Sequence, residues 1–164
     1  MILLGIDPGL ATTGYGFIKK TSKNLEVLDY GVISTPAKTD IPFRLKILSS
    51  DLKILLTKYK PEAVMVEKLF FCNNAKTALD VGQCRGVILL EMINKNIPVY
   101  EFTPLQVKQA VTGYGAATKL QIQKMVRTIL KLKKLPKPDD AADALAMAIA
   151  LANSIHSLNK KPVT

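Results

Sequence analysis

The chain has 164 residues, of which 48% are hydrophobic and 22% are charged, and its formal net charge is +10. This length is typical of one domain with its own core, and the composition is too apolar for a disordered chain. A two-domain kinase or a multidomain motor is therefore excluded, and a sequence pI of about 9.6 indicates a polyanionic partner, either nucleic acid or an anionic membrane surface.

The first half of the chain predicts four strands and one helix. The apolar start ends in the turn signal Asp7-Pro8-Gly9, and two further runs predict an antiparallel meander with it. Apolar residues at three- and four-residue steps predict an amphipathic helix, and a short apolar run after it predicts a buried strand parallel to the first. The expected elements are strands at 2–6, 14–20 and 25–34, a helix at 45–59 and a strand at 63–66.

The second half predicts helices around one more strand. Gly82 and Gly86 lie one turn apart in the first helix, where each glycine costs about 1 kcal/mol relative to alanine, so we expect another backbone to approach them. Thr103 before Pro104 predicts an N-cap, and Asp139 or Asp140 is expected to cap the last helix. The expected elements are a helix at 75–94, a strand at 97–102, helices at 104–111 and 119–132, and a last apolar helix that includes 141–152. Together the two halves indicate an α/β layer fold.

Targeting and redox signals are sparse. Cys72 and Cys84 are the two cysteines, too few for a disulfide scaffold or a tetrahedral cysteine site, so we expect reduced thiols. The apolar start ends at Asp7, too early for a signal peptide, and no apolar run reaches the roughly 18 residues of a membrane span. We therefore expect a cytoplasmic protein with no membrane partner.

Four carboxylates are expected to converge. Asp7 and Glu67 end two strands expected to be parallel neighbours, and ligands bind outside the carboxyl ends of such strands. Asp140 and Asp143 share one helix face, and Asp143 lies among alanines and aliphatic residues, where an unpaired carboxylate is costly. Divalent cations relieve the repulsion between converging acids, and hard oxygen ligands suit Mg²⁺ or Mn²⁺.

Each acid also has a plain structural interpretation. Asp7 before Pro-Gly is a common turn acid, Glu67 is able to pair with Lys68, and Asp139 or Asp140 is able to cap a helix. Asp143 is the hardest to explain in this way, because surface pairing does not account for an acid within an apolar helix. The prediction of a metal site rests on the joint placement of the four acids.

Residues 103–138, here called the basic window, combine many basic residues with no Asp or Glu. Lys108 and Lys119 flank a Gly-rich stretch, and Lys124 and Arg127 share a helix face with Lys131, which suits contacts to phosphates that do not read sequence. A solvated lysine face is the alternative. The eight basic residues are Lys108, Lys119, Lys124, Arg127, Lys131, Lys133, Lys134 and Lys137.

Several segments, in order along nearly the whole chain, resemble the RuvC family of bacterial Holliday-junction resolvases. The resemblance implies an RNase H-like fold with a five-stranded mixed sheet flanked by helices, and it implies a homodimer. We expect one such nuclease domain at 1–157 and a C-terminal tail at 158–164. The matching segments are Gly5-Ile6-Asp7-Pro8-Gly9, Thr13-Gly14-Tyr15-Gly16, Val66-Glu67, Asn74-Ala75, Gly82-Gln83-Cys84-Arg85-Gly86-Val87, Gln106-Val107-Lys108-Gln109, Gln123-Lys124-Met125-Val126-Arg127 and Asp140-Ala141-Ala142-Asp143-Ala144-Leu145-Ala146.

The resemblance also implies an activity and residue roles. The activity is paired, symmetric, metal-dependent hydrolysis of four-way DNA junctions during recombination and repair, with two Mg²⁺ ions per site, for which Mn²⁺ is able to substitute, and with a branch-migration complex as partner. Lys108 and Lys119 fall on basic positions that matter for activity or DNA contact, and Phe70 falls on a junction-probing aromatic position. Its alternative role, shared with Phe71, is to fill the core. The catalytic and metal-binding positions are Asp7, Glu67, Asp140 and Asp143.

Alternatives stay open at this point. Another RNase H-like nuclease, such as one that cuts RNA–DNA hybrids, carries similar carboxylates, and a non-catalytic junction-binding protein carries a similar basic surface. An ATP-binding protein of the sugar-kinase or actin type also begins with a strand and Asp-x-Gly, but it needs two domains. Asp139 is an extra acid beside the expected motif, and its spacing to Asp143 leaves Asp140 as the favoured site residue.

Overall fold

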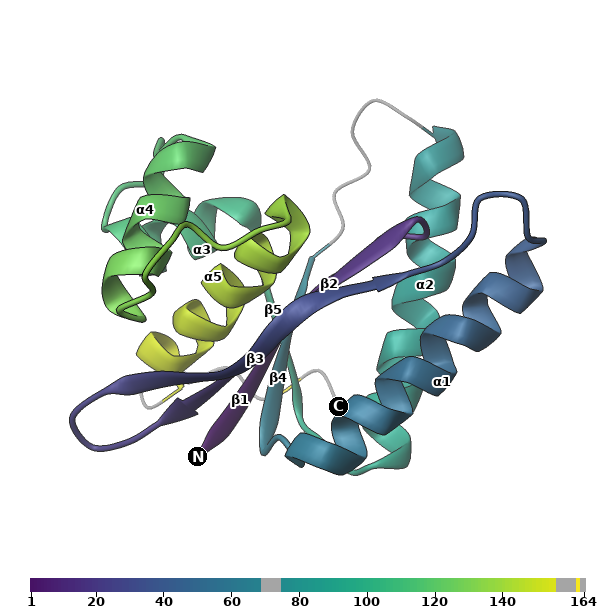
Figure 1. Ribbon diagram of the computed structural model, residues 1–164, viewed down its shortest axis with the longest axis horizontal. Coiled ribbons are helices and arrows are strands. Elements are labelled where there is room, and N and C mark those ends of the chain that lie inside the picture. The colour runs from purple at the N-terminus through teal and green to yellow at the C-terminus, as the bar shows by residue number, and fades with distance from the viewer. Residues whose placement is uncertain (69–74, 156–161, 163–164) are drawn as a thin grey trace.

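A computed structural model of the protein describes residues 1–68, 75–155 and 162. Within that part, five strands form one mixed sheet in the order β3-β2-β1-β4-β5, with helices on both faces (Figure 1). The expected α/β layer fold is confirmed. The elements are β1 Ile2–Asp7, β2 Thr12–Lys20, β3 Leu25–Ser34, α1 Ile41–Tyr59, β4 Ala63–Glu67, α2 Ala75–Asn94, β5 Val99–Phe102, α3 Pro104–Thr112, α4 Lys119–Ile129 and α5 Asp139–Ser154.

Strand β1 lies at the centre of the sheet and sets its direction. It pairs antiparallel with β2 and parallel with β4. On either side, β2 pairs antiparallel with β3 and β4 pairs parallel with β5. The expected meander and the expected parallel neighbours are both confirmed. The carboxyl ends of β1, β4 and β5 therefore meet at one edge of the sheet, where such sheets bind ligands.

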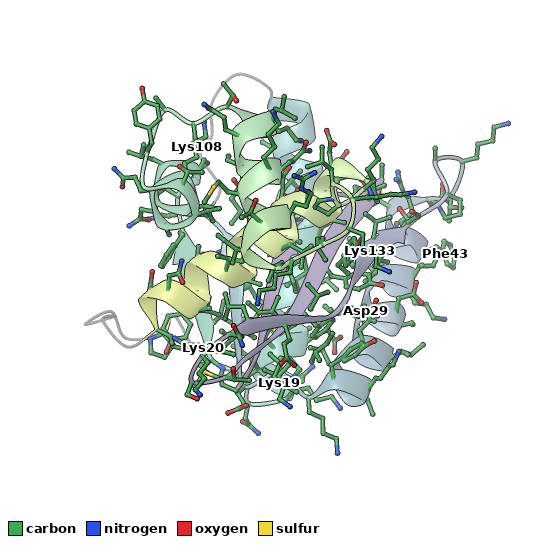
Figure 2. The ribbon with its side chains drawn as sticks, turned by 60° about the vertical axis from the view of Figure 1, so that its left-hand side comes forward. Lys19, Lys20, Asp29, Phe43, Lys108 and Lys133 are labelled. Carbon is green, nitrogen blue, oxygen red and sulfur yellow. The ribbon has the colours of Figure 1, made fainter. Side chains whose placement is uncertain are left out.

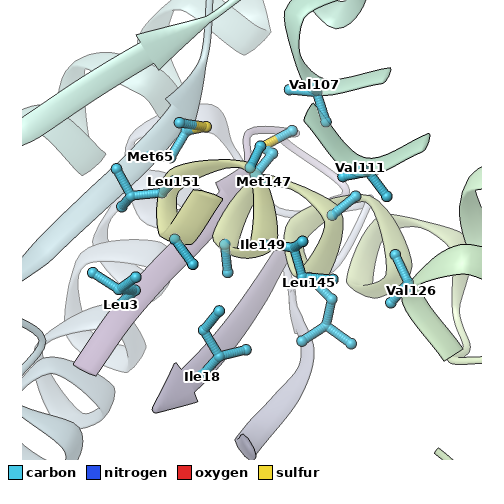
Figure 3. Close-up of a cluster of buried hydrophobic side chains, with 14 of the residues drawn as sticks. Leu3, Ile18, Met65, Val107, Val111, Val126, Leu145, Met147, Ile149 and Leu151 are labelled. Atoms are coloured by element: carbon cyan, nitrogen blue, oxygen red, sulfur yellow. The ribbon is translucent and has the colours of Figure 1, made fainter. Parts of the chain in front are cut away.

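Two hydrophobic cores lie on the two faces of the sheet. Helices α1 and α2 cover one face, and α3, α4 and α5 cover the other (Figure 1). Helix α5 is the centre of the second core, because every residue of 144–152 is buried. Figure 3 shows Leu145 and Ile149 of α5 beside Leu3 and Ile18 of the sheet. Burial on this scale fixes α5 rigidly against the strands that carry the candidate site.

Glycines let the backbone of α5 approach the strands closely. A Cβ atom on Gly5 of β1 would overlap the carbonyl oxygen of Ala144, and one on Gly14 of β2 would overlap the carbonyl oxygen of Asp140. Any larger residue would push the helix away, so these two positions need glycine for close approach rather than for backbone freedom. The contact at Gly14 places the first turn of α5 beside the end of β1, because Gly14 pairs with Asp7.

Several predicted boundaries differ from the structure. Helix α1 begins at Ile41, four residues earlier than expected, because Pro42 suits the first helical turn. Strand β5 begins at Val99 rather than at residue 97. Helix α4 ends at Ile129, and Lys131 beyond it has a left-handed φ of 52°, a conformation that stops a helix. The spacing of Lys131 predicted that it extends the basic face of α4. The structure shows that it does not.

The predicted cap of the last helix is wrong. The N-cap of α5 is Pro138, and Asp139 and Asp140 lie inside the first turn with no side-chain cap. Both carboxylates bond to other elements instead: Asp140 accepts a hydrogen bond from β2, and Asp139 accepts one from α4. By contrast, the predicted N-cap Thr103 is confirmed, with a capping box completed by Gln106.

The glycine pair of α2 has no close neighbour among the residues that the structure describes. A Cβ atom on Gly82 or Gly86 would meet no described atom within 4 Å. The expected approach of another backbone is therefore not made by the described residues. None of the described helices combines the length and the apolar character needed to cross a bilayer. Phe70, Phe71 and, apart from residue 162, the expected tail at 158–164 lie outside the described residues.

Candidate active site

Two carboxylates come from the ends of neighbouring parallel strands. Ile6 of β1 is the register partner of Val66 of β4, and both belong to the core on the α1 and α2 side. Because side chains alternate along a strand, the next residues, Asp7 and Glu67, point to the opposite face, toward α5. Both are partly buried. The sequence prediction that these two carboxylates emerge at one edge of the sheet is confirmed.

Two more carboxylates come from the first turns of α5. Asp140 and Asp143 lie three residues apart, so they share the helix face that meets the sheet. The Thr12 hydroxyl donates a hydrogen bond to Oδ2 of Asp140 at 3.1 Å, which fixes that carboxylate against the start of β2. We call the four residues Asp7, Glu67, Asp140 and Asp143 the acidic edge.

A lysine from α4 reaches the acidic edge. Thr118 begins α4 with a capping box completed by Gln121, so Lys119 is the first helical residue. Its Nζ lies 3.1 Å from Oδ2 of Asp143 and 3.3 Å from Oδ2 of Asp139. One ammonium therefore joins a carboxylate of the acidic edge to the exposed acid beside it.

Burial and mutual repulsion disfavour the charged form of carboxylates at the acidic edge. Burial raises the pKa of Asp7 from 3.8 to about 7, and repulsion from Glu67, Asp143 and Asp140 adds to the effect of burial. Burial and then the charge of Asp143 raise the pKa of Glu67. Burial also raises the pKa of Asp143, although Lys119 opposes that rise. The positive charge of Lys119 thus does not offset much of the repulsion between the carboxylates.

These carboxylates fit a divalent cation by their chemistry. Oxygen ligands with uncompensated negative charge are what Mg²⁺ and Mn²⁺ prefer. Within residues 1–68 and 75–155, however, no three His, Cys, Asp or Glu side chains are grouped closely enough to hold an ion as they stand. Asp143 is bonded to Lys119 instead. With Asp143 bonded to Lys119, metal binding at the acidic edge would need side-chain movement.

Four of the predicted DNA-contacting residues lie on helices α3 and α4, and α4 reaches the acidic edge through Lys119. Lys108 is partly buried on α3, whereas Lys124 and Arg127 are exposed on α4, opposite the buried Ile122 and Val126 of the same helix. Figure 2 shows Lys108 in the upper part of the molecule, while Lys19 and Lys20 lie in the lower part. Positive charge is thus not confined to one surface. The DNA-binding roles of Lys108, Lys119, Lys124 and Arg127 stay predictions, and that of Phe70 falls outside the described residues.

Three residues at the site were missed by sequence reasoning. Thr12 orients Asp140, Gln123 donates through Nε2 to Oδ1 of Asp139 at 3.0 Å, and Gly14 admits the backbone of α5. Nothing in the sequence marks Thr12 or Gln123, because their partners are distant in the chain. The glycines on two neighbouring predicted strands were a usable signal, since glycine within a strand indicates the close approach of another backbone.

Comparison with known proteins shows extensive similarity. A family model described as crossover junction endodeoxyribonuclease RuvC matches residues 3–151. The protein of that name from Halothermothrix orenii is 53% identical over 161 residues, 98% of this chain and 97% of its own length. The one from Alkaliphilus oremlandii is 54% identical over 154 residues, 94% of each chain.

Solved structures agree with this similarity. The structure of T. thermophilus RuvC in complex with Holliday junction substrate has a TM-score of 0.90 and 32% identity, and the match covers 99% of this chain and 100% of that chain. The yeast mitochondrial Holliday junction resolvase Ydc2 has a TM-score of 0.62 at 18% identity, with 92% and 78% covered, a likeness of fold. The expected RNase H-like fold is confirmed.

Proposed function

Because the chain belongs to the RuvC family of crossover junction endodeoxyribonucleases, we propose that it resolves four-way DNA junctions at its acidic edge. The chain is an endonuclease that hydrolyses phosphodiester bonds. One observation supports this placement of the site: carboxylates from β1, β4 and α5 meet at the edge of the sheet where such folds bind ligands, and the charges of three of them raise the pKa of Asp7.

The residues of the acidic edge suit the binding of metal ions at a phosphate. The family is metal-dependent, and we propose that Asp7, Glu67, Asp140 and Asp143 hold two Mg²⁺ ions, with Mn²⁺ able to substitute. Bound there, such ions activate a water and stabilise the charge of the leaving oxygen. Asp7 must release its proton before it binds a cation, and the hydrogen bond from Thr12 keeps one oxygen of Asp140 oriented.

The basic window supports the path of the DNA. Lys119 lies directly at the acidic edge, and Lys124 and Arg127 follow it on the exposed face of the same helix. We propose that Lys108, Lys119, Lys124 and Arg127 contact phosphates and that Phe70 contacts bases at the junction. Such phosphate contacts position DNA without reading its sequence. We therefore expect the acidic edge to select its substrate by the shape of the DNA.

A homodimer follows from the symmetry of the substrate. A four-way junction needs two cuts, and a two-fold dimer supplies two equal sites. Helix α2 offers a surface for this contact: Leu79, Leu90 and Ile93 are 66%, 56% and 53% exposed, and they lie on one stripe with Gly82 and Gly86. We propose that this stripe packs against a second copy, because close helix contact explains both the apolar exposure and the glycines.

Other parts of the proposal rest on the family alone. Residues 1–157 are proposed to act as one nuclease domain in the bacterial cytoplasm. A branch-migration complex is the proposed partner that delivers the junction. Purified components test this partner directly, because branch migration should change the positions at which the chain cuts a mobile junction.

The deciding experiment uses the purified chain, a synthetic four-way junction and Mg²⁺. We expect paired nicks that yield two ligatable duplexes with 5′-phosphate ends, no cleavage in EDTA, and little cutting of a linear duplex. Faster cutting of an RNA–DNA hybrid than of the junction would favour the alternative of another RNase H-like nuclease. Tight binding without cleavage in either Mg²⁺ or Mn²⁺ would favour a junction-binding protein.

The dimer is tested by placing charge on the stripe. Leu90→Glu should convert the dimer to a monomer in sedimentation analysis and should uncouple the two nicks, while Ile54→Glu serves as a matched control. Ile54 is 65% exposed and lies on α1, a different helix from the one that carries the stripe. A dimer that is unchanged in Leu90→Glu at micromolar concentration contradicts the proposed interface.

A further inference from the structure

The first turn of α5 carries two adjacent acids that face different elements. Asp140 accepts a hydrogen bond from Thr12 of β2 and belongs to the acidic edge. Asp139 faces α4: its Oδ2 lies 3.3 Å from Nζ of Lys119, and its Oδ1 accepts a hydrogen bond of 3.0 Å from Gln123. Both oxygens of Asp139 are therefore engaged by α4, whereas Asp140 is engaged by a strand.

Asp139 also differs from the acidic edge in its surroundings. Its side chain is 62% exposed, whereas that of Asp143 is 31% exposed. The charges of Glu67, Asp143 and Asp140 raise the pKa of Asp7, whereas, within the acidic edge, the charge of Asp139 contributes only to the raised pKa of Asp143. The Asp139 carboxylate has its pKa lowered by the hydrogen bonds from Lys119 and Gln123, the opposite of the shift at Asp7 and Glu67.

We propose that Asp139 is a positioning residue that holds the Lys119 ammonium beside the acidic edge and does not itself bind metal. This inference rests on the proposed function, in which Asp143 binds metal and Lys119 contacts DNA. It assigns separate roles to the adjacent acids: Asp140 faces the metal, and Asp139 faces the lysine.

The role becomes important when Asp143 binds a cation. Lys119 then loses Asp143, whose carboxylate lies 3.1 Å from its ammonium. Without a second partner, the lysine side chain would regain several flexible torsions. Asp139 remains 3.3 Å away, and Gln123 keeps that carboxylate oriented from the next turn of α4. The ammonium therefore stays at the mouth of the site, where a phosphate next to the cut bond would meet it.

The test compares Asp139→Asn, which removes the charge, with Asp139→Glu, which keeps it. Asp140→Asn is the reference for loss of a metal ligand. Glu26→Gln is the control for loss of one acid at a distance, because Glu26 lies at the far end of the sheet, where it is the register partner of Lys19. The full chain is labelled with ¹⁵N-lysine, and the ammonium signal of Lys119 is assigned by its loss in Lys119→Met.

The first readout is structural and needs no DNA. In saturating Mg²⁺ the Lys119 ammonium signal should stay ordered in the parent, Asp139→Glu and Glu26→Gln, and should become mobile in Asp139→Asn. Mn²⁺ affinity, followed by electron paramagnetic resonance, should change less than about threefold in Asp139→Asn and at least about tenfold in Asp140→Asn. An unchanged Lys119 signal, or equal losses of Mn²⁺ affinity in the two variants, overturns the proposal.

The second readout is single-turnover cleavage of a four-way junction. Asp139→Asn should slow cleavage about tenfold, a typical loss for a residue that orients another, and Asp139→Glu should restore the rate to within about twofold. In a Lys119→Met background, Asp139→Asn should have no further effect. A full additional loss there contradicts the role through Lys119. If the parent cuts no junction at all, the proposed function fails, while the ammonium and Mn²⁺ readouts still decide the role of Asp139.

Discussion

The acidic edge and the basic window lie side by side, but they are built in opposite ways. The acidic edge stands on β1, β4 and α5, the most deeply buried elements of the molecule, and its carboxylates are themselves partly buried. The basic window places Lys124 and Arg127 on the exposed face of α4. The carboxylates repel one another within a rigid frame, whereas Lys124 and Arg127 have long, flexible side chains that are exposed to solvent.

This difference shows which side chains must be held in precise positions. Metal ions require ligands held within a few tenths of an ångström, so the ligands belong on packed elements. Phosphates along a strand tolerate flexible partners, because each exposed cation contributes little by itself and the contributions add. Loss of one residue should therefore be severe at the acidic edge and mild in the basic window.

The largest expected effect is at Asp7. Asp7→Asn keeps the shape of the side chain but removes one anionic metal ligand, and cleavage of the junction should fall roughly 10³-fold, the scale of losing one strong charge-stabilising group. Junction affinity in Ca²⁺, measured by gel shift, should change by less than about threefold. Cleavage at the parent rate would show that the acidic edge is not the catalytic site.

The next effect is expected at Gly14, which sets the position of α5 and is not itself a proposed metal ligand. Gly14→Ala places a Cβ against the carbonyl oxygen of Asp140, so the start of α5 must move, and cleavage should fall about 10- to 100-fold, as for other losses of ligand orientation. Gly31→Ala is the matched control, because its Cβ would meet the far end of the Tyr15 side chain and not the backbone of α5. Its cleavage rate should stay close to that of the parent. Equal behaviour of the two variants in cleavage would contradict the role of this contact.

The pH dependence of cleavage should come next in size. The pKa of Asp7 is about 7, and a cation must displace its proton to bind. At limiting Mg²⁺, cleavage should therefore rise up to about tenfold per pH unit below this pKa and level off above it. Saturating Mg²⁺ should move the rise to lower pH. A flat profile of cleavage between about pH 5 and about pH 8 at limiting Mg²⁺ contradicts the raised pKa of Asp7.

The same group should control the stability of the metal-free protein. Because the pKa of Asp7 is raised from 3.8 to about 7, the folded state binds the proton more tightly than the unfolded chain does. Stability is therefore greatest below pH 3.8 for this group and falls as the pH rises to about 7. Asp7→Asn should be more stable than the parent in EDTA at pH 8, on the order of 1–3 kcal/mol, measured by urea unfolding.

The smallest expected effect is in the basic window. The double substitution Lys124→Ala with Arg127→Ala should weaken junction binding about 5- to 20-fold at moderate salt and lower the salt slope by roughly 1–2. Lys19→Ala, at the far end of the sheet, is the control and should change neither quantity. An unchanged salt slope in the double variant would mean that this face of α4 is only solvated.

The sequence predicted the members of the acidic edge because local signals marked them. Asp7 and Glu67 each follow an apolar strand, and Asp143 interrupts an apolar helix, so burial alone pointed to a shared site. The strands and helices themselves were recognisable from periodicity and from caps such as Thr103. The carboxylates' convergence then followed from the parallel pairing of β1 and β4, which connection rules favour.

What the sequence could not show depends on contacts between distant segments. The spacing of Asp139 suggested a cap, but the packing of α4 against α5 gave its carboxylate to Lys119 and Gln123 instead. The hydrogen bond from Thr12 to Asp140 spans 128 positions of sequence. The end of α4 was also placed too late, because the left-handed conformation of Lys131 has no marker in a non-glycine residue.

The contact of α5 with Gly5 and Gly14 has a consequence for sequence change in this protein. The helix rests on the strands through main-chain atoms, so the height of the acidic edge above the sheet is set by backbone thickness and not by side-chain volume. Core residues farther along α5 can then be exchanged for others of similar size without altering the spacing of the carboxylates. Selection for a better-packed core and selection for catalysis thus act on largely separate positions.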